Sequence, residues 1–148
     1  KILAIGCGAG SNTRRISHWF PDTIVEGIDN DAELIDAALD LNKSSSKLLS
    51  FHKKDLFGIQ PQVVSNFGVI SIQTMSWVPS DDLYSPIRHI MSLNSEWLCF
   101  SSLGFNGKVD AKIQINDFSS PAAWSTPYNI FSNQNIRASI YNRIQHIQ

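Results

Sequence analysis

The chain has 148 residues, 43% of them hydrophobic, which is enough to bury the core of one domain and excludes a disordered segment. Its 12 Lys and Arg residues are balanced by 13 Asp and Glu residues, and this absence of net positive charge argues against a nucleic-acid partner. No apolar stretch approaches the roughly 20 residues of a membrane helix, and two widely separated cysteines suit a reducing cytoplasm.

The chain opens with an apolar strand, a glycine-rich turn and a helix. Residues 2–5 are apolar, Gly6, Gly8 and Gly10 follow at every second position, and a helix is expected through Ile16. Glycine has no Cβ, and the first N–H groups of a helix lack acceptors, so such a turn brings bare backbone close to a bound molecule. The opening stretch therefore predicts a ligand site.

Strands and helices then alternate. Strands are expected at residues 23–28, 48–52, 68–73 and 96–103, and helices at residues 30–41 and 81–93. Asn30 and Glu33 have the spacing of a capping box. The alternation predicts an α/β fold with a doubly wound, mostly parallel Rossmann-like sheet and helices on both faces, a three-layer α/β/α sandwich. Ligands of such sheets bind beyond the carboxyl ends of the strands.

The last third of the chain is less regular. Residues 108–115 alternate as a strand does, and residues 116–129 are expected to form a loop. An isoleucine stripe with helical spacing follows, formed by Ile136, Ile140, Ile144 and Ile147. We expect one domain over residues 1–148 that is incomplete at both ends, with Trp19 and Trp97 in its core.

The spacing within the turn narrows the ligand class. A phosphate-binding P-loop requires a Lys that is absent after Ser11, and the dinucleotide fingerprint requires a glycine where Ser11 stands. The missing glycine weakens the interpretation of the turn as an NAD(P)-binding site without excluding it. An NAD(P)-dependent oxidoreductase therefore remains one alternative.

Three features in order resemble the class I S-adenosylmethionine-dependent methyltransferases: the motif AIGCGAG, the acid Asp29 after the second strand, and the motif HKKDLF around Asp55. The resemblance covers residues 1–103. It implies that S-adenosylmethionine is the cofactor, that Asp29 binds its ribose, and that Asp55 binds the adenine amine while the N–H of Leu56 faces the ring.

The resemblance also implies two sets of site residues. The cofactor-binding set comprises Gly6, Cys7, Gly8, Gly10, Asn12, Asp29, Asn30, Asp55, Leu56 and Gln73. The acceptor-binding set comprises Trp77, Trp124 and Tyr128, and residues 104–135 resemble an insertion that covers the substrate. Gln73 has an alternative role, which is to cap free backbone groups at the end of its strand.

The expected activity is methyl transfer from S-adenosylmethionine to a small or medium organic acceptor by in-line displacement, as in a bacterial small-molecule branch of the family. No catalytic residue is assigned, because proximity and alignment can supply much of the rate acceleration without a dedicated group, and His89 is a reserve candidate for a base. The four histidines show no metal-ligand spacing. Asp81 and Asp82 suit a helix N-terminus, and Cys7 suits the turn by its small size.

A second alternative is an inactive partner domain that binds the cofactor. Ala4 stands where the family usually has an acid, and the edge hairpin that the family carries after its fifth strand is not expected here. An exposed sheet edge would favour pairing with another chain.

Overall fold

The structure is a computed structural model that describes residues 1–60, 67–117, 119 and 124–144. The chain divides into two compact units, each with its own sheet. Unit 1 comprises residues 1–72 and 89–100, and unit 2 comprises residues 73–88 and 101–148. None of the helices in the described ranges combines the length and the apolar character needed to cross a membrane.

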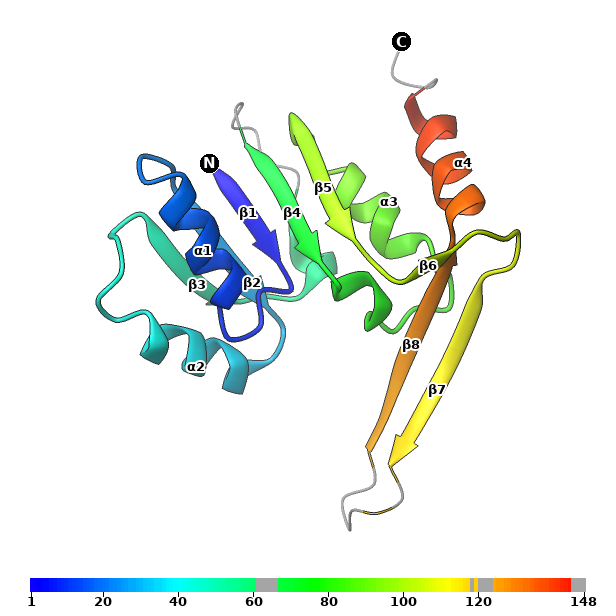
Figure 1. Ribbon diagram of the computed structural model, residues 1–148, viewed down its shortest axis with the longest axis horizontal. Coiled ribbons are helices and arrows are strands. Elements are labelled where there is room, and N and C mark those ends of the chain that lie inside the picture. The colour runs from blue at the N-terminus through cyan, green and yellow to red at the C-terminus, as the bar shows by residue number, and fades with distance from the viewer. Residues whose placement is uncertain (61–66, 118, 120–123, 145–148) are drawn as a thin grey trace. The chain divides into compact units, whose positions relative to one another are not determined.

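The sheet of unit 1 has five strands in the order β3-β2-β1-β4-β5 (Figure 1). Its strands are β1 (Ile2–Ile5), β2 (Val25–Asp29), β3 (Leu49–Lys53), β4 (Gly68–Ile72) and β5 (Trp97–Ser101). The pairs β1–β2, β1–β4 and β2–β3 are parallel. Strands β2 and β3 lie on one side of β1, whereas β4 and β5 lie on the other, so the strand order switches sides between β1 and β4. Ligands of doubly wound sheets bind at such a switch point.

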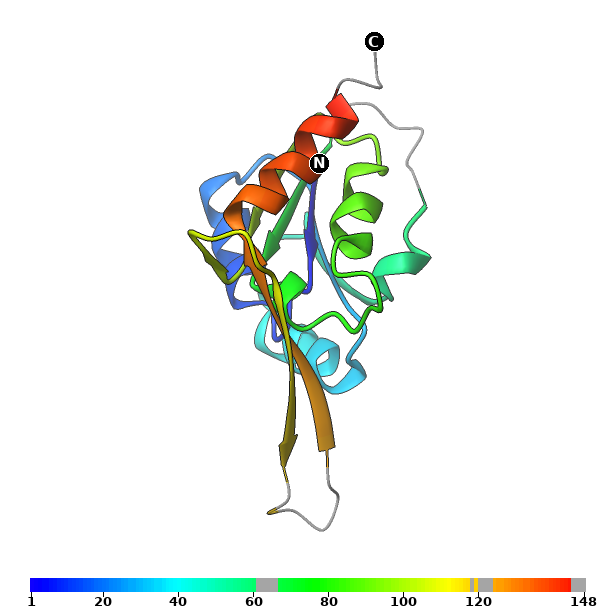
Figure 2. The same cartoon turned by 90° about the vertical axis from the view of Figure 1, so that its right-hand side faces the viewer.

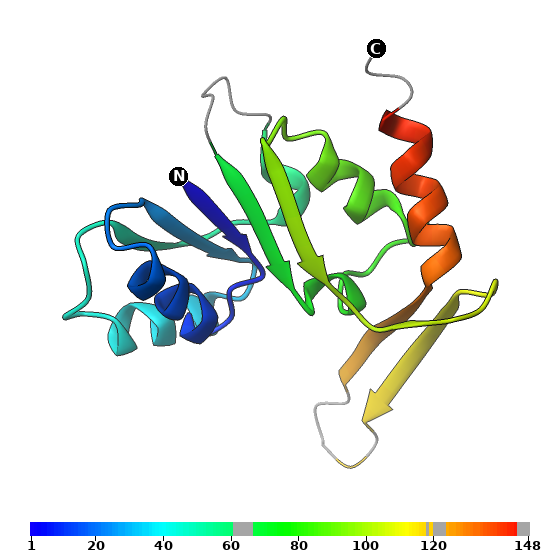
Figure 3. The same cartoon turned by 45° about the horizontal axis from the view of Figure 1, so that its top comes forward.

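Helices cover both faces of this sheet. They are α1 (Ser11–Trp19), α2 (Ala32–Leu41) and α3 (Ser85–Met91), which begins in unit 2 and ends in unit 1. Ile16 of α1 packs on Ile2 and Val25, and α2 packs on Phe51 of the same sheet face. Figure 2 shows α1 and the second half of α3 on opposite sides of the sheet, and Figure 3 shows the strands side by side. The predicted doubly wound α/β/α sandwich is confirmed.

Unit 2 contains a three-stranded sheet in the order β6-β8-β7. Its elements are the short helix η2 (Thr74–Ser76), β6 (Gly104–Phe105), β7 (Ala111–Asp117), β8 (Trp124–Ser132) and α4 (Asn133–Ile144). β7 and β8 pair antiparallel as a long ribbon, while β6 is parallel to the end of β8. Phe131 and Asn129 of β8 are buried and anchor the ribbon within the unit.

The expected loop over residues 116–129 is therefore wrong in part, because residues 116–117 belong to β7 and residues 124–129 belong to β8. Pro127 obscures this strand in the sequence, although a proline is tolerated in a strand without neighbours on both sides. Residues 118 and 120–123 of that expected loop lie outside the described residues. An antiparallel hairpin of β7 and β8 follows the fifth strand, but it belongs to the separate sheet of unit 2 and is not an edge hairpin of the five-stranded sheet. The isoleucine stripe lies on α4 as far as Ile144, and Ile147 lies outside the described residues.

Two helix boundaries also differ from the sequence expectation. Asn30 does not cap α2; the cap is Asp31, whose carboxylate accepts the N–H groups of Glu33 and Leu34 at 2.9 and 3.2 Å. The helix expected from residue 81 begins only at Ser85, because the preceding residues form a hydrogen-bonded turn.

The two tryptophans expected in the core are exposed. Trp19 is 67% exposed and Trp97 is 43% exposed. Trp97 nevertheless lies directly on Gly68, since a Cβ at that glycine would stand 1.9 Å from the indole. A tryptophan is large enough to pack one ring face and leave the other in solvent.

Candidate cofactor site

The glycine turn follows β1 and has a packed underside and an open upper side. Gly6, Gly8 and Gly10 all have positive φ angles, of 66°, 53° and 82°. A Cβ at Gly10 would lie 2.7 Å from the ring of Phe51, whereas no described atom lies within 4 Å of the Cβ position at Gly8. Gly10 therefore serves packing, and Gly8 leaves the space that a ligand lying against the backbone needs.

The carboxylate of Asp29 is fixed beside this turn. Its Oδ2 accepts the N–H of Gly8 at 2.8 Å, and its Oδ1 accepts the N–H of Asp31 at 3.1 Å. The backbone of Asp29 is held as well, since its carbonyl accepts the N–H of Lys54 at 2.7 Å. Each carboxylate oxygen can accept a further hydrogen bond, so Asp29 remains competent to bind a ligand hydroxyl.

Asp55 follows β3 and caps the short helix η1 (Leu56–Gly58). Its Oδ1 accepts the N–H of Phe57 at 2.8 Å, and the residue is exposed. Leu56 is buried, and its N–H has no acceptor among the described residues. This pair therefore offers one carboxylate acceptor and one backbone donor to a ligand, and its role in binding adenine stays a prediction.

The N-terminus of α1 faces the turn without a side-chain cap. Gly10 is the N-cap residue, and the first turn contains no acidic side chain. In the described part of the chain, the N–H groups of Ser11, Asn12 and Thr13 have no acceptor. Such a terminus carries partial positive charge, so it attracts an anionic group such as a carboxylate.

Cys7 is a packed thiol and does not act as a nucleophile. Burial first, and then the charge of Asp29, raises the pKa of Cys7 to about 12. The thiol therefore stays protonated at neutral pH, and its Sγ lies 3.5 Å from the carbonyl oxygen of Gly8. A Cβ at Gly27 would stand 3.1 Å from the Cβ of Cys7, so space at this position is scarce.

The remaining predicted residues of unit 1 have different environments. Asn12 and Asn30 are exposed. His89 is half-buried: its Nε2 lies 3.1 Å from the carbonyl oxygen of Ile59, and its ring lies 5.4 Å from that of Phe57. Because a carbonyl only accepts, Nε2 must carry the proton, and Nδ1 is the nitrogen left to serve as a base.

Unit 2 holds Gln73 and the predicted acceptor-binding residues. Gln73 has a φ of 61°, unusual for a residue other than glycine, and its exposed side chain makes no capping hydrogen bond. Trp77 and Tyr128 meet edge to face with ring centres 4.8 Å apart, and Trp77 is 47% exposed. The side chain of Trp124 lies outside what the structure describes.

Sequence reasoning did not find the polar cluster around Asp110, which holds unit 2 together. The carboxylate of Asp110 accepts the hydroxyl of Tyr84 and the N–H of Ser132, both at 2.7 Å, and the amide of Asn135 at 2.8 Å. Burial first, and then Asp110, raises the pKa of Tyr84. The partners are 22 to 26 residues from Asp110 in the chain, so no local sequence pattern predicts these hydrogen bonds.

No group of three side chains that could hold a metal ion occurs within the described ranges.

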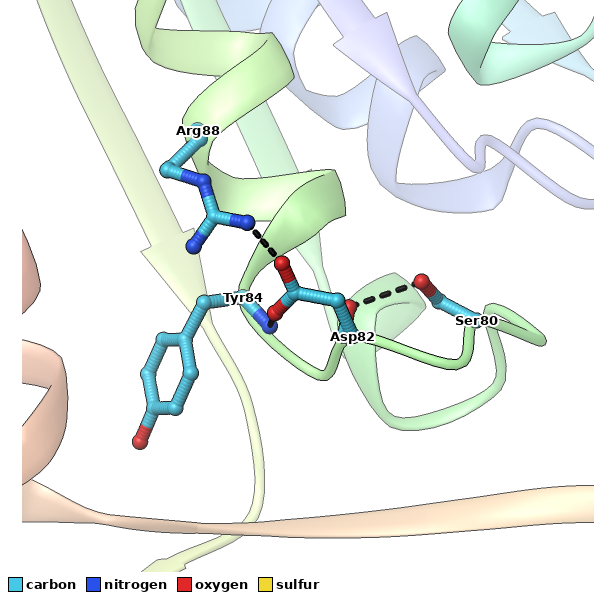
Figure 4. Close-up of polar contacts among 4 residues, drawn as sticks. All are labelled: Ser80, Asp82, Tyr84 and Arg88. Carbon is cyan, nitrogen blue, oxygen red and sulfur yellow. Dashed lines mark hydrogen bonds and ion pairs between the residues drawn. The ribbon is translucent and has the colours of Figure 1, made fainter.

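Asp82 has a local structural role close to α3. Its Oδ1 accepts the N–H of Tyr84 at 3.0 Å, and its other oxygen forms an ion pair with Arg88 (Figure 4).

Known proteins resemble the chain in sequence. The sequence model of a family described as "Methyltransferase domain" matches residues 2–94. The trans-aconitate 2-methyltransferases of the Mycobacterium strains KMS, JLS and MCS are 30% identical to it over 79 residues. That match covers 53% of this chain but only 28% of each relative, so it spans less than a third of their length.

Solved structures resemble the chain in fold. A Listeria monocytogenes protein classed as an S-adenosylmethionine dependent methyltransferase matches with a TM-score of 0.70 and 12% identity, over 95% of this chain and 74% of its own. The DhpI-SAM-HEP complex matches with a TM-score of 0.66 and 16% identity, over 99% of this chain and 68% of its own. The chain therefore has the methyltransferase fold and, since the family match covers more than half of its length, it belongs to the methyltransferase domain family.

Proposed function

We propose that this chain binds S-adenosylmethionine at the carboxyl ends of β1, β2 and β3 and transfers its methyl group to a small or medium organic acceptor. The observation that carries the proposal is the carboxylate of Asp29, held by the N–H of Gly8 beside a turn with open space above it. The bound cofactor supplies a methyl group on a sulfonium, whose leaving group is a neutral thioether.

Each side of the cofactor has a matching group in unit 1. The free acceptor capacity of Asp29 suits the ribose hydroxyls, and Asp55 with the N–H of Leu56 suits the adenine edge. The uncapped N-terminus of α1 suits the carboxylate of the methionine part. Gly6, Cys7, Asn12, Asn30 and Gln73 complete the proposed set.

The acceptor is proposed to meet Trp77, Tyr128 and Trp124, with residues 104–135 covering it. A small-molecule acceptor is supported by the relatives that are named for trans-aconitate, and a bacterial small-molecule branch of the family is part of the proposal. Since methyl transfer depends mainly on alignment at about 3 Å, no dedicated base is assigned. We also propose a cytoplasmic location, which the free thiols of Cys7 and Cys99 suit.

Calorimetric titration with S-adenosylhomocysteine tests cofactor binding. We expect saturable binding by the full chain, and we expect Asp29→Ala to weaken it by about 1.5–3 kcal/mol, the range for losing hydrogen bonds to a charged group. Asp22→Ala is the matched control, because Asp22 is an exposed acid before β2 and outside the site. Thermal unfolding of each variant separates lost binding from lost folding.

An unchanged affinity in a folded Asp29→Ala protein would show that this acid does not bind the ribose. Enhancement of NADH fluorescence on mixing, without S-adenosylhomocysteine binding, would favour the oxidoreductase alternative instead. Transfer of a labelled methyl group to any compound of a metabolite extract would exclude the inactive partner domain.

A further inference from the structure

Unit 1 carries a half-open cavity with charged, polar and apolar lining residues, apart from the proposed cofactor residues. Residues of α1 and of the loop between α2 and β3 line this space of about 440 Å³. Arg14 and His18 line it on one side, and Ser44, Ser45 and Ser46 line it on the other.

The position of this cavity separates it from the cofactor site. Its lining residue Pro21 precedes β2, and its lining residue Ser46 precedes β3, so the cavity lies at the amino ends of the strands. Asp29 and Asp55 follow the carboxyl ends of the same strands. The inference therefore does not rest on the proposed function.

Positive charge in the cavity is not neutralised by the protein. Arg14 forms no ion pair with any described residue, and neither Asp nor Glu lines the cavity. The nearby carboxylate of Asp40 is engaged by Lys43, with Nζ and Oδ1 2.8 Å apart. An arginine in this state offers a planar fork of donors to an oxyanion.

The serines add neutral donors opposite the arginine. Ser46 Oγ accepts the N–H of Leu48 at 3.1 Å, while the hydroxyls of Ser44 and Ser45 have no partner in the described part of the chain. His18 lies in the last turn of α1, where a positive charge would stabilise the helix dipole, whereas Arg14 lies nearer the middle of the helix, where the dipole gives no reason for a basic residue. The serines opposite Arg14 offer hydrogen-bond donors to an oxyanion.

Apolar side chains border the charged centre. Leu41, which is 65% exposed, lines the cavity beside Pro21. Arg14 and His18 also line an adjoining open cavity of about 690 Å³ along α1, which Trp19 borders with 67% of its surface exposed. At its other end this second cavity reaches Asn12 of the proposed cofactor set. A ligand that joins an oxyanion to a ring would satisfy both surroundings. We propose that this cavity binds a phosphate ester with an apolar or aromatic group.

Calorimetric titration of the full chain with phenyl phosphate tests this site. We expect saturable binding, weaker binding of inorganic phosphate because it lacks the ring, and no saturable binding of benzyl alcohol. Arg14→Gln and the double variant Ser44→Ala/Ser45→Ala should each weaken phenyl phosphate binding about tenfold, as expected for lost hydrogen bonds to a charged group.

Lys47→Gln is the matched control. It removes one positive charge from the same loop, but Lys47 does not line the cavity, and its phenyl phosphate affinity should stay within about twofold of the wild type. Absence of saturable phenyl phosphate binding, or an equal loss in Lys47→Gln, would overturn the proposal. Unchanged S-adenosylhomocysteine affinity in Arg14→Gln would show that the two sites are separate, whereas failure of the wild type to bind that ligand would count only against the proposed function.

Discussion

The glycine turn of unit 1 and the ribbon of unit 2 are held in place by different kinds of contact. The turn is shaped by its own glycines and fixed by Asp29, the residue that ends the next strand. The ribbon depends on contacts between distant segments: Asn129 donates to the carbonyl of Val78 at 3.0 Å, and Asp110 joins Tyr84 to β8. Substitution in the turn therefore tests backbone shape, whereas substitution in the ribbon tests long-range polar contacts.

The largest effect is expected at the packed side of the turn. Gly10→Ala combines a left-handed backbone, at φ 82°, with a Cβ 2.7 Å from the ring of Phe51. Together, backbone strain and overpacking should lower the free energy of unfolding by about 2–5 kcal/mol. Urea denaturation followed by circular dichroism measures this loss.

Gly8→Ala is the control that separates shape from packing. Its φ of 53° carries the same kind of backbone strain, but its Cβ would meet open space, so we expect a loss of only about 1–2 kcal/mol in stability. In this variant the loss in the free energy of S-adenosylhomocysteine binding should exceed the loss in the free energy of unfolding, because the added methyl group occupies the proposed ligand space. Equal stability losses at Gly8 and Gly10 would contradict the distinction between the two sides.

In unit 2, Asp110→Asn should change how stability depends on pH. Burial alone would raise the pKa of Asp110, but the N–H of Ser132, the hydroxyl of Tyr84 and the amide of Asn135 outweigh it and lower the pKa. A lowered pKa stabilises the folded protein above the ordinary value of 3.8, and this contribution is lost as the pH falls through the folded-state pKa. Asp110→Asn should cost about 1–3 kcal/mol at neutral pH.

Urea denaturation repeated between about pH 5 and about pH 2 checks this sign, because the difference between wild type and Asp110→Asn should shrink as the medium becomes more acidic. Tyr84→Phe removes one of the three donors and keeps the ring contact with Phe131, so its effect should be smaller and in the same direction. A difference that grows on acidification would contradict the role given to this carboxylate.

The fold of unit 1 follows from local sequence patterns. Apolar runs, the glycine turn and the acids after two strands predict the strands, the crossovers and the place of the site, because each depends on neighbours close in the chain. The N-cap of α2, which the sequence analysis assigned to Asn30, shows the limit of this reasoning. Asn30 and Asp31 are both good capping residues, and only the backbone angles of the folded chain select Asp31.

Local sequence patterns predict neither the sheet of unit 2 nor the cavity between α1 and the serine loop. Residues 124–129 contain a proline and polar residues, so their strand depends on pairing with β7 and on the burial of Asn129. The cavity forms where α1 meets a serine loop some 30 residues further along the chain. The exposure of a side chain also depends on residues far away in the sequence: Trp19 is apolar and on a helix, yet 67% of it is exposed.

The smallest effect is expected at the ion pair between Arg88 and Asp82 (Figure 4). The two side chains are 45% and 54% exposed, so solvent screens their attraction and Arg88→Gln should change the free energy of unfolding by less than about 0.5 kcal/mol. Asp82→Ala should cost more, about 1 kcal/mol, because the carboxylate also accepts the N–H of Tyr84 ahead of α3. If urea denaturation gave equal losses of stability for the two variants, the ion pair and not the backbone hydrogen bond would stabilise this turn. The local structure ahead of α3 would then depend on the attraction between two charged side chains.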